Sequence, residues 1–255
     1  MISKNKIKFL KSLSIKKYRN KYNTIIIEGR RLIEESINLR ADIQNIWFTK
    51  DELDAISNQN LISSLKNLKV SYDLIEDKDL KYISDTKNNQ GMIAEVKLTP
   101  NKGNLSKTNH IVVLDSISDP GNLGTIFRTC AWYGVKSVIV TENTVDPYNL
   151  KCIRAALGAH FYFKNICKMN NQEILDFIKE KKYQLICTDL DGECIDSIEV
   201  EKKWAVIFGS ESNGINVDFK MFPKLSIQKL GNMESLNVSV ACGIVLDQLF
   251  TKFKG

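Results

Sequence analysis

Three short turns rich in glycine, asparagine and serine carry the residue types best suited to binding a polar ligand. They span residues 115–128, 208–215 and 230–241. Each adjoins an apolar segment, and ligands of open α/β sheets bind where strands give way to such turns. The first turn contains neither a G-x-G-x-x-G fingerprint nor a G-x-x-x-x-G-K-[ST] phosphate loop. It therefore does not predict a dinucleotide or nucleoside triphosphate site.

Two residues of the first turn, Asn122 and Arg128, are candidates for substrate contact. Asn122 lies near an expected helix start, where it could cap the helix or bond a substrate oxygen. Arg128 follows about a turn and a half later and could reach back to an anion at that end. A capped helix with a surface arginine explains the same residues, so this turn alone leaves both interpretations open.

The other two turns also have a functional and a purely structural interpretation. Glu211 follows the apolar run 204–208 and could accept hydrogen bonds from a hydroxyl or a cation, or be a solvated loop acid. Glycines beside it allow a backbone to approach a ligand closely. Ser235 is a good N-cap for the apolar helix expected from that residue onward. Polar residues crowded at this helix start suggest an oxyanion or carboxylate site, or capping only.

Composition limits the chemistry that these turns can perform. The chain of 255 residues has two histidines, His110 and His160, so a three-histidine metal site is impossible and a histidine-centred triad is not expected. We expect no metal. The six cysteines include no C-x-x-C pair and are expected to be buried free thiols. No apolar run approaches the roughly 20 residues of a membrane span, and the start lacks signal-peptide features, so we expect a cytoplasmic protein without a membrane partner.

Positive charge is concentrated at the N-terminus. Residues 1–24 hold eight lysines and arginines and no acid, whereas the whole chain has a formal net charge of +6. Interleaved Ile7, Leu10, Leu13 and Tyr18 predict a short amphipathic helix with a basic face suited to phosphate. The alternatives are a merely solvated terminus and, with less support, a membrane-surface helix. The candidate RNA contacts here are Lys8, Lys11, Lys16, Lys17 and Arg19.

Alternating apolar segments predict two α/β units that position these residues. The first half predicts strands at 24–29, 43–49, 70–74 and 91–96, with helices at 30–39, 51–65 and 77–83. The second half predicts strands at 110–114, 137–140, 183–188, 204–209 and 224–227, with helices at 123–133, 172–181 and 235–252. Apolar strands alternating with helices imply a mostly parallel sheet covered on both faces. Residues 99–109 are polar and rich in turn formers, so we predict domains at 1–98 and 110–255 joined by this linker.

Taken together and in this order, the three turns resemble the signature motifs of the SpoU/TrmH class of the SPOUT superfamily. Members are RNA ribose 2′-O-methyltransferases that use S-adenosylmethionine. Residues 146–159 resemble the segment between the first two motifs. Residues 27–32 and 84–91, which include Arg30 and Arg31, resemble a small ribosomal-protein-like RNA-binding domain found in many members. These two arginines join the candidate RNA contacts.

The resemblance implies an α/β fold whose C-terminal catalytic domain is a trefoil-knotted, mostly parallel sheet preceded by that small α/β domain. It also implies homodimers, with the helix from Ser235 onward packed against the partner. Asn122, Arg128, Glu211, Ser235 and Asn237 match the polar motif residues, and Gly209, Ile227 and Leu236 match positions that contact the methyl donor. Ser212 and the dipeptide Gln228-Lys229 depart from the family pattern and could alter donor affinity.

The function expected from this resemblance is methyl transfer from S-adenosylmethionine to a ribose 2′-hydroxyl, with 23S ribosomal RNA favoured and transfer RNA second. In the family mechanism, the arginine promotes deprotonation of the hydroxyl. A guanidinium group is effectively always protonated, so we expect Arg128 to anchor the target phosphate and stabilise the developing alkoxide. A non-catalytic RNA-binding or assembly protein is the alternative from another class.

Overall fold

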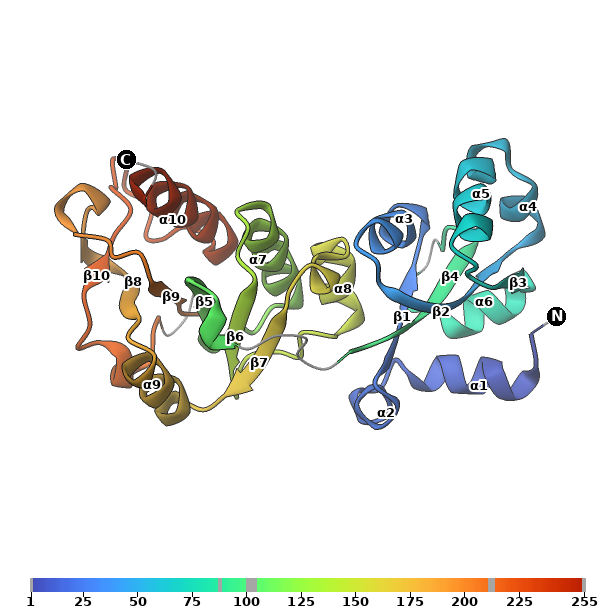
Figure 1. Cartoon of the computed structure of the whole chain (residues 1–255), viewed down its shortest axis with the longest axis horizontal. Coiled ribbons are helices and arrows are strands. Elements are labelled where there is room, and N and C mark those ends of the chain that lie inside the picture. The colour runs from blue at the N-terminus through green and yellow to red at the C-terminus, as the bar shows by residue number, and fades with distance from the viewer. Residues whose placement is uncertain (1, 87–88, 100–104, 211–213, 254–255) are drawn as a thin grey trace. The chain divides into compact units, whose positions relative to one another are not determined.

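The computed structural model describes residues 2–86, 89–99, 105–210 and 214–253 (Figure 1). The chain forms two compact units, one made of Met1–Pro100 with Tyr148–Phe161 and the other of Asn101–Pro147 with Tyr162–Gly255. Residues 148–161 thus pack within the first unit, whereas the sequence analysis assigns them to the second domain. Among the described residues, no helix is long and apolar enough to span a membrane.

The first unit is a mixed four-stranded sheet with helices around it. In chain order its helices and strands are α1 (Lys4–Ser12), α2 (Lys16–Tyr22), β1 (Thr24–Glu28), α3 (Arg30–Asn38), β2 (Asp42–Phe48), α4 (Lys50–Asp54), α5 (Gln59–Asn67), β3 (Tyr72–Leu74), α6 (Asp77–Ile83), β4 (Met92–Lys97) and α8 (Leu150–Ala156). The strand order is β1-β4-β2-β3. The β1–β4 and β2–β4 pairs are antiparallel, and the β2–β3 pair is parallel.

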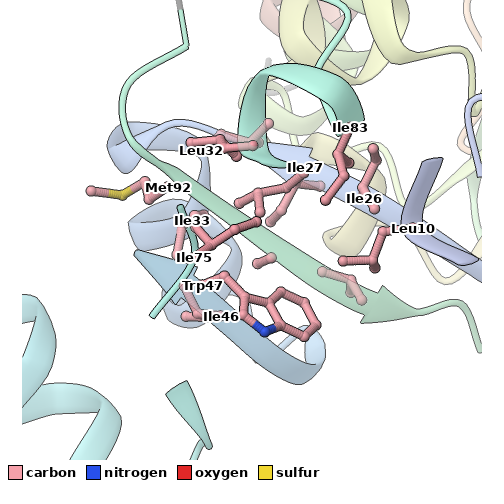
Figure 2. Packing of buried hydrophobic residues seen from close by; sticks show 14 of the residues in the cluster. Leu10, Ile26, Ile27, Leu32, Ile33, Ile46, Trp47, Ile75, Ile83 and Met92 are labelled. Carbon is pink, nitrogen blue, oxygen red and sulfur yellow. The ribbon is translucent and has the colours of Figure 1, made fainter. Parts of the chain in front are cut away.

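The basic N-terminal segment is built into the core of this unit. It forms two helices, α1 and α2, where the sequence predicted one. Ile7, Leu10 and Leu13 are buried in the same hydrophobic cluster as Ile26 of β1 and Trp47 of β2. Figure 2 labels Leu10, Ile26 and Trp47 in this cluster. Because the apolar stripe packs inside the unit, it does not provide an apolar face for a membrane surface. The stripe serves folding, and only the basic face remains for a ligand.

The second unit contains a six-stranded sheet in which every pair is parallel. Its helices and strands are β5 (His110–Leu114), α7 (Pro120–Trp132), β6 (Ser137–Thr141), β7 (Asn165–Met169), α9 (Asn171–Glu180), β8 (Gln184–Glu193), β9 (Trp204–Phe208), β10 (Lys224–Leu225) and α10 (Val238–Phe253). The strand order is β10-β8-β9-β5-β6-β7. Figure 1 shows α9 on one face of this sheet and α7 and α10 on the other. The expected parallel sheet with two covered faces is confirmed.

The central strands are apolar because both of their faces are buried. Alternate residues Ile111 and Val113 of β5 pack in one cluster with Ile174 and Ile178 of α9. Val112 between them is equally buried, and it points to the opposite face, since successive strand residues alternate. The sheet therefore forms a rigid base for the turns that follow its strands.

Two local differences from the sequence prediction have clear causes. Strand β7 was missed because it is a partly exposed edge strand containing Lys168, so its apolar pattern is weak. The single helix expected at 51–65 is split into α4 and α5. Between them, the buried Asn58 side chain donates to the backbone carbonyl of Glu52 at 2.7 Å and to its carboxylate at 2.7 Å. An asparagine that binds the backbone in this way competes with helix continuation.

Candidate functional site

A cavity of about 550 Å³ lies beside the carboxyl ends of β8, β9 and β10 in the second unit. Gly209, Ile227 and Leu236, the three residues predicted to contact a methyl donor, all line it, and so does Ser235. They come from the loops after β9 and β10, which converge because the carboxyl ends of parallel strands lie on one edge of a sheet. The structure thus brings together residues that are separated by up to 27 positions in the chain.

The loop after β9 closes tightly on itself at Gly209. Ser210 and Gly214 exchange backbone hydrogen bonds of 3.2 and 2.9 Å. A Cβ atom on Gly209 would lie 2.2 Å from the carbonyl carbon and oxygen of Gly214. The glycine is therefore required for one stretch of backbone to pass another, whereas the sequence analysis related it to the approach of a ligand. Glu211 and Ser212 lie outside the described residues.

The start of α7 uses Asp119 rather than Asn122 as its cap. The Asp119 side chain accepts from the backbone N–H of Asn122 at 2.8 Å, and Pro120 begins the helix. Proline at the first helical position is favourable because its missing N–H would have no partner there. The Asn122 side chain instead accepts a hydrogen bond through Oδ1 from Asn237 Nδ2 at 3.0 Å.

The start of α10 uses Asn237 rather than Ser235. Asn237 Oδ1 accepts from the backbone N–H of Ser239 at 2.9 Å and from its hydroxyl at 2.6 Å. Helix α10 consequently begins at Val238, three residues later than predicted. Serine and asparagine are nearly equal as N-caps, so the sequence did not decide between them. Ser235 is left exposed on the cavity wall.

Arg128 lies on α7 six residues after Asn122 and is exposed. Within the part of the chain that the structure describes, its guanidinium group has no ion pair or hydrogen bond. The structure thus brings together only some of the polar residues predicted for the site. Asn122 is hydrogen-bonded to Asn237, and the chain neighbours of Asn237 line the cavity. Arg128 lies on the same helix as Asn122 and projects into solvent.

The polar end of the cavity includes groups that the sequence analysis did not single out. Asp189, within β8, lines the cavity, and its carboxylate lies 2.8 Å from Lys224 Nζ. This lysine holds the pKa of Asp189 below its ordinary value by hydrogen bonding and charge. Gln228 and Lys229, which depart from the family pattern, are exposed along the same wall. The two residues that differ from the family pattern are therefore part of the cavity wall.

Asp115 and Thr141 form a second cluster missed from the sequence. Both are buried, and Thr141 Oγ1 donates to Asp115 Oδ1 at 3.2 Å. Asp115 Oδ2 accepts from the backbone N–H of Asn216 at 2.7 Å. The sequence signal for this cluster was an aspartate directly after the apolar run 111–114, because a buried carboxylate needs hydrogen-bonding partners.

Most of the cysteines are buried, as expected from the sequence. Cys130, Cys152, Cys187 and Cys242 are buried, whereas Cys167 is half-buried and Cys194 is exposed, so the expectation of buried thiols is wrong for these two. Burial raises the pKa of Cys187 to about 12 and that of Cys130 well above its ordinary value. These two thiols therefore stay protonated at neutral pH and are poor nucleophiles.

The predicted RNA contacts of the first unit differ in their surroundings. Lys8, Lys16, Lys17 and Arg31 are exposed. Lys11 lies 3.4 Å from Asp85, and Arg30 lies 2.7 Å from Glu34. The structure does not support an RNA contact for Arg19, which is 4% exposed and donates to the carbonyl oxygens of Leu13 and Ser14 at 2.9 and 2.6 Å. It holds the end of α1, where carbonyls otherwise lack partners.

The residues that resemble an RNA-binding domain form one connected group. Glu28 Oε2, at the end of β1, accepts from the hydroxyls of Ser84 at 2.6 Å and Thr86 at 3.1 Å. Gln90 Oε1 accepts from the backbone N–H of Arg30 at 3.0 Å, at the start of α3. These bonds link the segments 27–32 and 84–91 within the first unit.

Comparison with known proteins decides the family. The family model of the SpoU rRNA methylases matches residues 109–247, which is more than half of the chain. The chain belongs to the SpoU rRNA methylase family. A second match, to an MRM3-like substrate binding domain, covers residues 4–94.

Individual relatives of this SpoU family member match nearly its whole length. The 23S rRNA (guanosine(2553)-2'-O)-methyltransferase RlmP of Bacillus subtilis is 31% identical over 247 residues, covering 96% of this chain and 95% of that protein. The human mitochondrial rRNA methyltransferase 3 is 25% identical, covering 90% of this chain and 68% of that protein. The AdoMet-bound rRNA methyltransferase of Sinorhizobium meliloti has the same fold, with a TM-score of 0.82 at 23% identity and coverage of 99% and 96%.

Proposed function

We propose that this protein transfers a methyl group from S-adenosylmethionine to a ribose 2′-hydroxyl of 23S ribosomal RNA. The observation that carries the proposal is the cavity at the carboxyl end of the parallel sheet, where Gly209, Ile227 and Leu236 meet. RlmP, which is named for this reaction on 23S rRNA, aligns with almost the whole chain and supports the choice of substrate.

The cavity fits a nucleoside-sized methyl donor. Its volume of about 550 Å³ lies within the range of roughly 300–1,000 Å³ that is usual for small-molecule sites. Leu225, Ile227 and Val245 provide apolar walls for a planar base. Backbone groups around Gly209 and Leu236, together with the Ser235 hydroxyl, provide polar atoms along the same cavity. Asp189 adds a negative charge that suits the cationic groups of S-adenosylmethionine.

The chain's own residues would position the acceptor and stabilise charge. When bound, S-adenosylmethionine supplies an electrophilic methyl group on a sulfonium centre. Arg128 would anchor the phosphate beside the target ribose and stabilise the negative charge that develops on its 2′-oxygen. The Asn122–Asn237 pair would hold the helix starts of α7 and α10 in register. In-line positioning contributes more to such a transfer than strong acid–base catalysis does.

The first unit would bind the RNA. Its match to a substrate-binding domain and the exposed lysines of α1 and α2 support this assignment. Each lysine that contacts a phosphate releases counterions and so contributes to affinity. Transfer RNA is the second candidate substrate, because proteins of similar fold include the TrmH/SpoU tRNA modifying enzyme of A. aeolicus.

We also propose a homodimer and a knotted C-terminal chain, both of which the family resemblance implies. Large apolar side chains on the exposed sides of α7 and α10 support the dimer: Trp132 is 85% exposed and Val240 is 51% exposed. Exposed apolar side chains that are covered by a partner would explain both residues. Light scattering of the wild type and of Trp132→Glu tests it, with the dimer expected only for the wild type.

Calorimetry with S-adenosylmethionine separates the enzyme from a non-catalytic RNA-binding protein. We expect one donor molecule to bind per chain in the absence of RNA. A folded protein that binds RNA but shows no heat of binding with the donor would favour the non-catalytic alternative.

A further inference from the structure

Asp115 is a buried charged residue that the mechanism above does not use. It directly follows β5, is 2% exposed, and does not line the cavity. Its backbone N–H donates to the carbonyl of Phe208 at 2.8 Å, which continues the pairing of β5 with β9 by one residue. A carboxylate in such a position is costly unless its oxygens are well bonded. The groups that donate hydrogen bonds to the Asp115 carboxylate therefore indicate its structural role.

The partners of Asp115 come from three adjacent strand ends. Oδ1 accepts from the hydroxyl of Thr141, the last residue of β6, at 3.2 Å and from that of Ser116 at 3.0 Å. Oδ2 accepts from the backbone N–H of Asn216, in the loop after β9, at 2.7 Å. Thr141 Oγ1 also accepts from the backbone N–H of Ser116 at 2.9 Å. One carboxylate thus joins the chain after β5 to the end of β6 and to the loop after β9.

The hydrogen bond between Asp115 and Asn216 is important because the two residues directly before Asn216 form part of the cavity wall. Gly214 and Ile215 both line the cavity, and Ile215 is buried. The other end of this loop is fixed by Gly209, which is too close to Gly214 to tolerate a side chain. The loop is therefore held at its start by backbone packing and at its end by a charge-assisted hydrogen bond, which is stronger than a neutral one.

We propose that Asp115 is a positioning residue for the methyl donor, acting through Asn216 to set the loop wall of the cavity. This inference rests on the proposed function, since it concerns donor binding in that cavity. Asp115 itself touches neither donor nor RNA. Its loss leaves residues 214–216 free to move away from the donor, so donor affinity falls before the fold is lost.

Two variants remove the same hydrogen bond from opposite sides. Asp115→Ala removes the acceptor. Asn216→Pro removes the donor, and the φ of −56° at Asn216 suits proline. Because the Asn216 side chain also accepts from the backbone N–H of Asp218 at 3.0 Å, Asn216→Ala is the matched control: it loses that bond and keeps the backbone N–H. Thr144→Val controls for the loss of a buried hydrogen bond nearby, from Thr144 Oγ1 to the Leu114 carbonyl at 2.9 Å.

The experiment measures S-adenosylmethionine affinity by calorimetry, with circular dichroism and thermal unfolding on each variant. We expect Asp115→Ala and Asn216→Pro each to weaken donor binding by about tenfold or more, as loss of a hydrogen bond to a charged group does. Asn216→Ala and Thr144→Val should bind within about twofold of the wild type, with thermal midpoints lowered to a similar degree. The loss of affinity in the double variant Asp115→Ala/Asn216→Pro should be clearly smaller than the sum of the two single losses, because both changes remove the bond between Asp115 and the Asn216 backbone.

Other outcomes overturn the inference in distinguishable ways. Equal affinity of Asn216→Pro and Asn216→Ala, or of Asp115→Ala and Thr144→Val, would refute the role of Asp115 while leaving the proposed function intact. Additive losses in the double variant would also refute it. A wild type that does not bind the donor would refute the proposed function itself. If Asp115→Ala does not fold, Asp115→Asn keeps one acceptor oxygen for Asn216 and should retain donor affinity, and the Asn216 pair decides the question alone.

Discussion

Asn237 Nδ2 donates a 3.0 Å hydrogen bond to Asn122 Oδ1, joining the first turn of α10 to the first turn of α7. The two residues are 115 positions apart in the chain. The same Asn237 side chain uses its oxygen to cap α10 by accepting from Ser239. One amide therefore caps α10 through its oxygen and joins α10 to α7 through its nitrogen. Of these two helices, α10 lines the cavity.

This division of roles predicts different costs for two alanine variants. Asn237→Ala loses the cap and the bridge and should lower the free energy of unfolding by about 1–3 kcal/mol. Asn122→Ala loses the bridge and keeps the cap of α10, and it should cost about 0.5–1.5 kcal/mol. Asn122→Asp keeps an acceptor for Asn237 and should be closer to the wild type. Urea titrations measure all three, and a cost for Asn122→Ala equal to that for Asn237→Ala would argue against the double role.

Arg128 is expected to act on the acceptor and not on the methyl donor. Arg128→Ala should reduce methyl transfer by at least about 100-fold, as loss of a charge-stabilising group does, while donor affinity stays within about twofold. Arg128→Lys retains the charge without the planar guanidinium and should recover part of the activity. Radiolabel transfer and calorimetry provide the two readouts. Full activity of Arg128→Ala would remove this residue from the mechanism.

Replacing Gly209 by alanine is predicted to disrupt the loop after β9 for steric reasons. Gly209→Ala would place a Cβ 2.2 Å from the backbone of Gly214, so the loop must shift and donor binding should fall below detection. Gly231 is the matched control: it lines the same cavity, and a Cβ there would meet nothing within 4 Å. Calorimetry should therefore show near-normal donor affinity for Gly231→Ala. Normal binding by Gly209→Ala would mean that the loop after β9 does not form the donor site.

His110 makes stability depend on pH. It stacks on Trp204 with ring centroids 4.5 Å apart, and burial lowers its pKa from the ordinary 6.5. The unfolded chain therefore binds a proton more readily than the folded one, and stability is lost as pH falls below about 6.5. His110→Phe keeps the stacking and cannot titrate. The difference in unfolding free energy between wild type and His110→Phe should change between pH 7 and 5.5, to the disadvantage of the wild type at pH 5.5; a constant difference would exclude a contribution from His110.

The basic face of α1 and α2 is expected to bind RNA phosphates. Deleting residues 1–24 is unsuitable as a test, because Leu10 and Leu13 are fully buried and the unit would be damaged. The triple change of Lys8, Lys16 and Lys17 to glutamine should instead weaken RNA binding. It should also reduce the slope of log affinity against log salt by roughly 0.7–0.9 for each phosphate that a lysine no longer neutralises.

The control for that experiment alters net charge equally in the same unit. Lys50, Lys66 and Lys69 are also exposed, and changing these three to glutamine should leave most of the salt slope unchanged. Equal effects of the two triple variants would mean that overall charge, and not this face, drives RNA binding.

Much of the second unit follows from local sequence. Strands such as β5 and β9 are continuous apolar runs because both faces are covered, and such runs are easily recognised. Strand β7 was missed because an edge strand has less apolar surface to bury. The three turns were located correctly because glycine and asparagine mark strand ends. The convergence of the second and third turns on one cavity follows from a parallel sheet.

What the sequence could not provide was the assignment of individual polar atoms. Asp119 and Asn122 are both good caps, as are Ser235 and Asn237, and only tertiary contacts decide which is used. Arg19 was taken for an RNA contact because its burial depends on how α1 and α2 pack. Asp115 was overlooked because its partners lie up to 101 positions away. The placement of residues 148–161 in the first unit likewise depends on contacts remote in sequence.

The most direct test of the account is the transfer of labelled methyl from S-adenosylmethionine to unmodified ribosomal and transfer RNA, followed by alkaline digestion. A 2′-O-methyl group blocks alkaline cleavage, so label in alkali-resistant dinucleotides identifies the ribose as the acceptor. The account predicts such dinucleotides from 23S ribosomal RNA with the wild type and none with Arg128→Ala. Label only from transfer RNA would preserve the reaction and overturn the substrate, whereas no transfer to either RNA by a correctly folded protein would contradict the central claim.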